Sequence, residues 1–242
     1  MGKNLVILVL IIVIFILGIS LGIILTKKPQ VRQDNKIENQ PSFTKKEMPI
    51  VGVDDKGFGV IGIMSVEVKP GSGLVLVNIN NVLADYLTQL SARNAALIAS
   101  NFTNKTLSNT DIIYNIQANA SIVEGPSAGS VMAIDTIAAL TNRQVKPNIY
   151  MTGAISIDGS ITAVGGITEK AKAVAQHHGE LFVIPASNYI VSYSEQKACT
   201  NLDKIKYCEI KYIQDKTDLN KFLGVKIQQV KNIYEAVNYT LI

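Results

Sequence analysis

The sequence predicts an α/β (α+β) domain with a mixed sheet, preceded by one N-terminal transmembrane helix. From residue 51 onward, short apolar runs bounded by glycine and proline alternate with longer runs that have helical spacing. This alternation favours helices packed against a mixed sheet. Residues 5–26, by contrast, are 22 consecutive positions without a charged side chain.

The uncharged run at residues 5–26 has the length of a membrane span. At ~1.5 Å per residue it forms about 33 Å of helix, whereas the hydrocarbon core of a bilayer is roughly 30 Å thick. A cleaved signal peptide usually has a shorter apolar region ending in a small-x-small site, and none is evident. We therefore expect an uncleaved single-pass anchor over residues 1–28; a cleaved signal or a buried helix are the alternatives.

Residues 29–48 are polar, with Pro29 and Pro41 among many lysine, glutamine, asparagine and glutamate residues. Such a composition cannot bury a core, so this segment is expected to be a tether. The remaining residues, 49–242, are enough for one domain with a core of its own.

The domain is expected to begin with strands. Apolar runs at residues 57–68 and 74–79 flank a Gly/Pro turn, which predicts a hairpin or two adjacent strands. Further runs predict strands over residues 112–120, 148–156, 181–185 and 204–213.

Helices are expected between these strands. The first is capped by Asn80 or Asn81 and continues to Ser100. The run at residues 130–140 is strongly helix-forming. Residues 168–178 form another helix that Gly179 would close, and a final helix lies within 227–241. Leucines keep helical spacing around the first helix, at Leu83, Leu87, Leu90 and Leu97.

Two glycine-rich segments each present one reactive side chain. Ser127 lies between glycines, directly before the helical run at 130–140, where free N–H groups favour a developing negative charge. Lys170 follows a glycine pair and opens its own helix, whose positive end disfavours an ammonium and so helps the lysine to act as a neutral base. A serine needs such a base to attack a carbonyl. The pair therefore predicts a Ser–Lys catalytic dyad.

Each residue also has an ordinary interpretation. Ser127 alone can be a helix cap, and Lys170 alone can be a solvated helix lysine. His177 and His178 are the competing bases, but they lie roughly 10–12 Å beyond Lys170 along the same helix at 1.5 Å per residue. A Ser-His-Asp triad is therefore not expected, and neither a metal site nor a cofactor is indicated.

Three blocks occur in order along the domain: Gly125-Pro126-Ser127-Ala128-Gly129, Met151-Thr152-Gly153, and Gly165-Gly166-Ile167-Thr168-Glu169-Lys170. They resemble the proteolytic domain of Lon proteases, in which the serine of the first block is the nucleophile and the last lysine is its base. Lys170 follows Ser127 by 43 residues (170 − 127), which agrees with that family. More weakly, the resemblance extends from about residue 51 to 239.

The resemblance implies the family's compact α/β protease fold and roles for two further residues. Thr152 stands where the family has a hydroxyl that orients the lysine. Glu124 stands where the family often has aspartate, and it is expected beside the dyad, limiting access or tuning Lys170. The family usually has glutamate after Met-Thr-Gly, whereas this chain has Ala154. The resemblance also implies a homo-oligomer, and the form that we expect is a hexameric ring.

We therefore expect a membrane-anchored serine endopeptidase that cuts peptides and unfolded or flexible proteins. The sequence contains no Gly-x-x-x-x-Gly-Lys-Ser/Thr loop, so no ATPase of its own is expected. The alternative is a non-catalytic membrane-tethered binding or assembly module that keeps the protease fold, with Ala154 as its best argument. Nucleic acid is not an expected partner, because the net charge is only +4, the cations are scattered and the chain has no tryptophan.

Two features of the sequence give opposite indications of the side of the membrane on which the domain lies. Four cations after the anchor outnumber the two before it, Lys3 and the N-terminal amine, which favours a cytoplasmic domain, although large domains can translocate regardless of nearby charge. Cys199 and Cys208 are the only cysteines; they are either two unrelated thiols or a disulfide, which would imply an oxidising compartment. We expect an extracytoplasmic protease domain. The cations after the anchor are Lys27, Lys28, Arg32 and Lys36.

Overall fold

The computed structural model describes residues 2, 12, 43–80, 83–118, 122–187, 192–202, 205–215 and 224–242. The chain divides into two units, Met1–Asn39 and Gln40–Ile242. The expected anchor, apart from residues 2 and 12, and the tether up to residue 42 lie outside the described residues. Among those that are described, no helix combines the length and the apolar character that crossing a bilayer requires.

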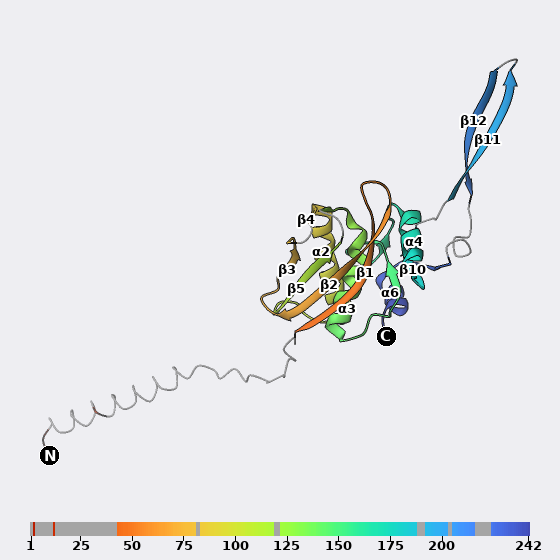
Figure 1. Cartoon of the computed structure of the whole chain (residues 1–242). Coiled ribbons are helices and arrows are strands. Elements are labelled where there is room, and N and C mark those ends of the chain that lie inside the picture. Colours follow the sequence, from red (N-terminus) through yellow and green to blue (C-terminus); the bar gives the residue numbers. More distant parts are fainter. Residues whose placement is uncertain are drawn as a thin grey trace. The chain divides into compact units, whose positions relative to one another are not determined.

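A seven-stranded sheet forms the centre of the second unit (Figure 1), in the order β13-β10-β7-β1-β2-β5-β3. β2 runs antiparallel to both of its neighbours, and the other neighbouring pairs are parallel, which confirms the expected mixed sheet. The strands are β1 (Thr44–Val53), β2 (Gly59–Pro70), β3 (Val75–Asn78), β5 (Thr110–Gln117), β7 (Ile149–Met151), β10 (Leu181–Pro185) and β13 (Lys226–Val230). β1 begins inside the range expected to be the tether, because its first residues pair with β2.

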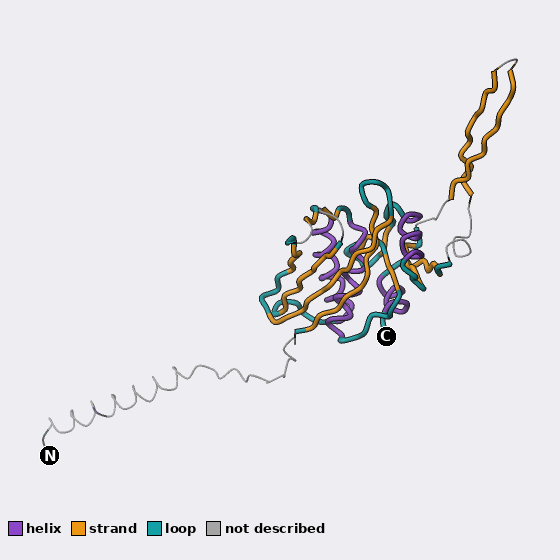
Figure 2. The backbone as a smooth tube through the Cα atoms, viewed as in Figure 1, coloured by secondary structure: helices purple, strands orange, loops and turns teal. Residues whose placement is uncertain are grey.

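Helices cover both faces of this sheet (Figure 2). Successive strand residues point to opposite faces. Within β10, Val183 joins the larger apolar core, whereas Phe182 and Ile184 join a smaller one with α4 (Ile167–Gln176). The larger core is shared with α2 (Tyr86–Thr103), α3 (Gly129–Thr141) and α6 (Ile233–Thr240). Thus α4 packs on the face opposite to α2 and α3.

The first helix differs from the sequence prediction at its start and in its buried face. α2 begins at Tyr86, after a cap at Asp85 rather than Asn80 or Asn81. Its buried face consists largely of alanines, and small side chains allow the closest approach of two helix axes. The leucines at helical spacing are instead exposed, at 38–55%: Leu83, Leu87, Leu90 and Leu97.

The hairpin or adjacent pair expected around residues 70–74 is also wrong, because β5 lies between β2 and β3. The connecting turn passes over the beginning of β5. There the Asp111 carboxylate accepts hydrogen bonds from Ser72 N (2.8 Å) and Leu74 N (2.9 Å). A Cβ at Gly71 would overlap this carboxylate, so a larger residue there would have to displace Asp111 from these hydrogen bonds.

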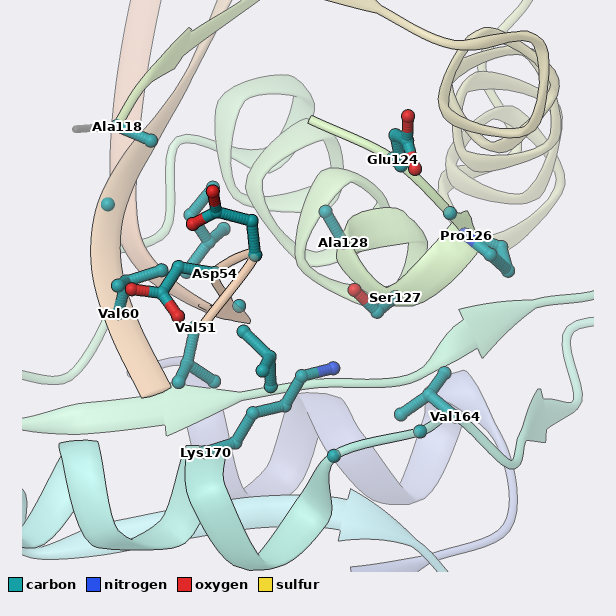
Figure 3. Close-up of a pocket in the computed structure, with 18 of the residues that line it drawn as sticks. Val51, Asp54, Val60, Ala118, Glu124, Pro126, Ser127, Ala128, Val164 and Lys170 are labelled. Atoms are coloured by element: carbon teal, nitrogen blue, oxygen red, sulfur yellow. The ribbon is translucent and has the colours of Figure 1, made fainter. Parts of the chain in front are cut away.

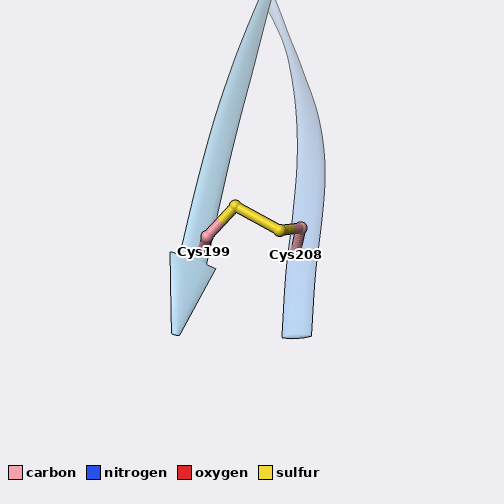
Figure 4. The surroundings of a disulfide bond; sticks show 2 residues. All are labelled: Cys199 and Cys208. Atoms are coloured by element: carbon pink, nitrogen blue, oxygen red, sulfur yellow. A yellow bond between two sulfur atoms is a disulfide. The ribbon is translucent and has the colours of Figure 1, made fainter. Parts of the chain in front are cut away.

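Two-stranded sheets complete the fold of the described residues. The expected strand at 148–156 is divided into β7 and β8, and the helix expected over 168–178 ends at Gln176. β11 and β12 form an antiparallel hairpin in which Cys199 lies opposite Cys208, and the two are joined by a disulfide (Figure 4). The additional strands are β4 (Leu83–Ala84) with β6 (Ile122–Val123), β8 (Ala154–Ile155) with β9 (Ile161–Thr162), and β11 (Ser192–Leu202) with β12 (Ile205–Asp215).

One carboxyl group is buried inside the larger core. Asp135 on α3 is 0% exposed, and neither of its oxygens has a hydrogen-bond partner among the described residues. Burial, together with the charge of Glu47, raises the pKa of Asp135 well above its usual value of 3.8. The unfolded chain releases this proton at lower pH than the folded chain does. The free energy of unfolding therefore falls as the pH rises above the pKa that Asp135 has in the unfolded chain.

We predict that Asp135→Asn raises the free energy of unfolding at pH 8 by about 1–3 kcal/mol, because an amide of the same shape cannot ionise. The difference should shrink as the pH falls toward 4, where the unfolded aspartate is itself protonated. Urea unfolding at both pH values measures it. Asp158→Asn, at a carboxylate in a surface turn, is the control. Equal stability of wild type and Asp135→Asn at pH 8 would contradict the prediction.

Candidate active site

Ser127, Lys170 and Glu124 line one cleft of about 1150 Å³ (Figure 3). The end of β1 (residues 50–53), the β1–β2 turn and the segment at residues 163–166 form its other walls. Lys170 extends from α4 toward the segment that carries Ser127. The fold therefore brings together the two residues that the sequence predicts as a dyad.

Ser127 lies in the middle of a short 3₁₀ helix, η1 (Pro126–Ala128), which leads directly into α3. This matches the predicted position near a helix N-terminus. Gly125 precedes η1 with φ 86° and ψ 166°, a conformation open essentially to glycine alone. Gly129 follows, and a Cβ there would come within 2.9 Å of Ile155, so close packing requires this second glycine. Ser127 is left partly exposed to the cleft.

The turn between β7 and β8 holds η1 from one side. Gly153 N donates to the carbonyl of Ser127 at 2.9 Å, and Ser130 N donates to the carbonyl of Gly153 at 3.0 Å. Thr152 Oγ1 also donates to the Ser127 carbonyl, at 3.3 Å. These bonds use backbone groups that a continuous strand would give to its neighbours, which explains the division of the expected strand at 148–156.

Lys170 comes from the first turn of α4 and is only 4% exposed. Its Nζ donates a hydrogen bond to Thr152 Oγ1 at 3.2 Å. Burial lowers the pKa of Lys170 to about 8, because the charged ammonium loses its hydration. Gly59 of β2 allows α4 to approach the sheet closely, because a Cβ at this position would lie 2.1 Å from the carbonyl oxygen of Glu169.

Thr152 connects the two residues of the predicted dyad. It is fully buried, accepts from Lys170 and donates to the carbonyl of Ser127. In the described structure the ammonium is bonded to Thr152 and not to the Ser127 hydroxyl. Such catalytic contacts often tighten only when substrate binds.

The other candidate residues take no part in the hydrogen bond between Lys170 and Thr152. Glu124 lines the cleft and is exposed. The cause of the lowered pKa of Lys170 is burial and not the charge of Glu124. Ala154 lies in β8, opposite Thr162, and is not a lining residue. His177 lies at the far end of α4, where its Nδ1 is 3.0 Å from the carbonyl of Ala173.

Sequence reasoning missed two features of the site. The β1–β2 turn contributes Asp54, Asp55 and Lys56 to the cleft, and nothing in the local sequence indicates that this turn faces Ser127. Asp85 reaches the backbone of Gly125 from the start of α2. An aspartate before a helical run was a detectable cap signal, but its second contact depends on tertiary structure. Within the described ranges, no group of three or more His, Cys, Asp or Glu side chains is placed to hold a metal ion.

A buried lysine, a serine at a helix start and a threonine between them define a site of the serine-hydrolase type. Residues 59–192 match the Lon protease (S16) C-terminal proteolytic domain, and the chain belongs to this family. It is 27% identical over 183 residues to Lon protease 1 of Borreliella burgdorferi, covering 68% of this chain and 22% of that protein.

Two further relatives cover shorter parts of the chain. The archaeal Lon protease of Thermoplasma acidophilum is 29% identical over 149 residues, which are 59% of this chain and 22% of that protein. The Lon protease of Methylocella silvestris is 42% identical over 79 residues, or 33% and 10%. The chain thus spans less than a quarter of the length of these relatives. The family and the relatives support a serine-type endopeptidase.

We predict that the Lys170 amine titrates near pH 8, because burial destabilises its charged form. Carbon-13 NMR of the lysine Cε groups, assigned with Lys170→Met, measures the midpoint directly. Lys172, on the same helix but outside the cleft lining, is the internal reference. A midpoint for Lys170 at the ordinary value of 10.5 would contradict the desolvated site.

Proposed function

We propose that this chain is a membrane-anchored serine endopeptidase with Ser127 as nucleophile and Lys170 as general base. One observation carries the proposal: a lysine with its pKa lowered to about 8 shares a cleft with Ser127 and is tied to it through Thr152. A base with a pKa near the working pH is neutral in a useful fraction of molecules and still accepts a proton readily.

The proposed reaction has two stages. Ser127 Oγ attacks the scissile carbonyl while the neutral Lys170 amine takes its proton, and backbone N–H groups near Ser127 stabilise the oxyanion. The lysine then gives this proton to the leaving amine, which breaks the peptide bond and leaves an acyl-enzyme. Water next attacks the ester, with Lys170 again as base, and releases the second product and free Ser127.

Thr152 and Glu124 have supporting roles in this proposal. Thr152 orients the lysine, because its hydroxyl accepts from Nζ while its own proton is directed to the Ser127 carbonyl. This arrangement holds Nζ without adding a negative charge that would favour the ammonium. Glu124 stands exposed on the cleft wall, where its carboxylate limits access to the nucleophile.

The substrates we propose are peptides and unfolded or flexible proteins. An extended chain fits a cleft of about 1150 Å³, whereas a folded domain does not. The 242 residues contain no phosphate-binding loop, so we propose cleavage without an ATPase of the chain's own. We also propose a homo-oligomer, the hexameric ring that the resemblance implies, which light scattering of the full chain in detergent can test.

We predict that Ser127→Ala and Lys170→Met each abolish cleavage of an unfolded protein in the absence of ATP, because nucleophile and base act as one unit. Ser127→Ala should also lose labelling by a fluorophosphonate. Lys172→Met is the matched control and should keep both activities. Cleavage that persists in Lys170→Met but is lost when His177 is changed would overturn the dyad, and failure of wild-type protein to label would favour the non-catalytic module.

We further propose that residues 1–28 anchor the chain and that the domain lies outside the cytoplasm. The 22-residue uncharged run and the Cys199–Cys208 disulfide support this arrangement. We predict that both thiols are unreactive in membranes lysed with a thiol-blocking reagent, and that protease added to intact cells digests the domain. Two free thiols together with protection from that protease would contradict the proposed side.

A further inference from the structure

The start of α2 holds the backbone of the segment that carries Ser127. Asp85 Oδ1 accepts from Thr88 N at 2.7 Å, which is an ordinary helix cap. Its second oxygen, Oδ2, accepts from Gly125 N at 3.1 Å, across 40 residues of sequence. Thr88 Oγ1 donates to the carbonyl of Gly125 at 3.2 Å. Both backbone polar groups of Gly125 are therefore held by one turn of α2.

Gly125 is a residue whose conformation needs such support. Its φ of 86° and ψ of 166° lie in a sparsely populated region, and residues there persist only where their surroundings fix them. A Cβ at Gly125 would meet no atom within 4 Å, so its backbone conformation and not the available space calls for glycine. Gly125 lies two residues before Ser127, and any change in its ψ would rotate the η1 backbone.

The two ends of this segment are held by different elements. Gly153 N and Thr152 Oγ1 bind the Ser127 carbonyl from the β7–β8 turn, whereas α2 binds Gly125. The two strands β4 and β6 pair in parallel. Because β4 directly precedes Asp85 and β6 directly precedes Glu124, this pairing brings together the two segments that form the contact between Asp85 and Gly125. The start of α2 therefore acts as a second, independent support for the nucleophile.

Building on the proposed function, we infer that Asp85 and Thr88 are positioning residues that set the orientation of Ser127 through Gly125. They act on the backbone and do not line the cleft. A displacement of about 1 Å at a reacting group can cost roughly 100-fold in rate. Their loss is therefore expected to slow acylation of Ser127 while leaving Lys170 and the substrate cleft unchanged.

The ionised state of Asp85 matters for this role. Burial alone would raise its pKa, but the hydrogen bonds from Thr88 and Gly125 outweigh burial and hold the pKa below its ordinary value. A carboxylate has only acceptors and so satisfies two N–H groups at once. Asparagine keeps one acceptor oxygen, which can still cap Thr88 N, and turns its NH₂ toward the Gly125 N–H. Asp85→Asn therefore separates helix capping from support of Gly125.

The test measures the rate at which a fluorophosphonate labels Ser127 in full-length protein. Asp85→Asn and Thr88→Val should label roughly 10- to 100-fold more slowly than wild type. For peptide cleavage the loss should fall on kcat, with the pH midpoint of activity unchanged. Thr88→Ser keeps the hydroxyl and should restore the rate. Asp111→Asn is the matched control, since that carboxylate also accepts from two backbone N–H groups but far from the cleft.

Each outcome distinguishes the inference from the proposed function. Wild-type protein that does not label would overturn the proposed function and this inference with it. Normal labelling of wild type, Asp85→Asn and Thr88→Val alike would overturn the inference alone. A loss of rate that Asp111→Asn shares, in proportion to a lower melting temperature, would show a purely structural role. Hydrogen exchange at the Gly125 amide should quicken in Asp85→Asn if the contact is broken as inferred.

Discussion

The hydrogen bond between Lys170 Nζ and Thr152 Oγ1 is the contact on which the site depends. It places a buried amine against a neutral hydroxyl, so that the amine is held without a carboxylate that would keep it charged. The same hydroxyl donates to the Ser127 carbonyl. The sheet, the β7–β8 turn and two helical segments meet here. β7 ends at Met151, directly before Thr152; α4 supplies Lys170, and η1 supplies Ser127.

This contact explains several features of the surrounding fold. Gly59 and Gly179 allow α4 to lie close to the sheet, because a Cβ at either position would overlap a neighbouring atom. Gly125 adopts a backbone conformation before η1 that other residues rarely adopt, and Gly129 allows close packing against Ile155 after it. The nearly complete burial of α3 fixes the helix that follows Ser127, and it encloses Asp135 without a hydrogen-bond partner among the described residues. The glycines thus allow the close packing that buries Lys170 and positions Ser127.

Ser127 and Lys170 line one cleft and the sheet is mixed, as the sequence predicted, because glycine-rich blocks and apolar periodicity are local signals. The sequence could not predict which face of α2 is buried, since its alanines pack inward and leucines such as Leu87 and Leu90 lie outside. It also could not show that β5 separates β2 from β3, because strand order depends on distant pairing. The contact between Asp85 and Gly125 could not be predicted either, because 40 residues of sequence separate the two.

The most direct test of a lysine base is the pH dependence of the rate at which Ser127 is acylated. Below the pKa of Lys170 the amine is protonated and cannot accept a proton, so the rate should rise through a midpoint at about pH 8 and then level off. Lys170→Arg, which stays charged at these pH values, should remove the rise. A rate that is flat from pH 6 to 10, or a rise that survives in Lys170→Arg, would contradict the account.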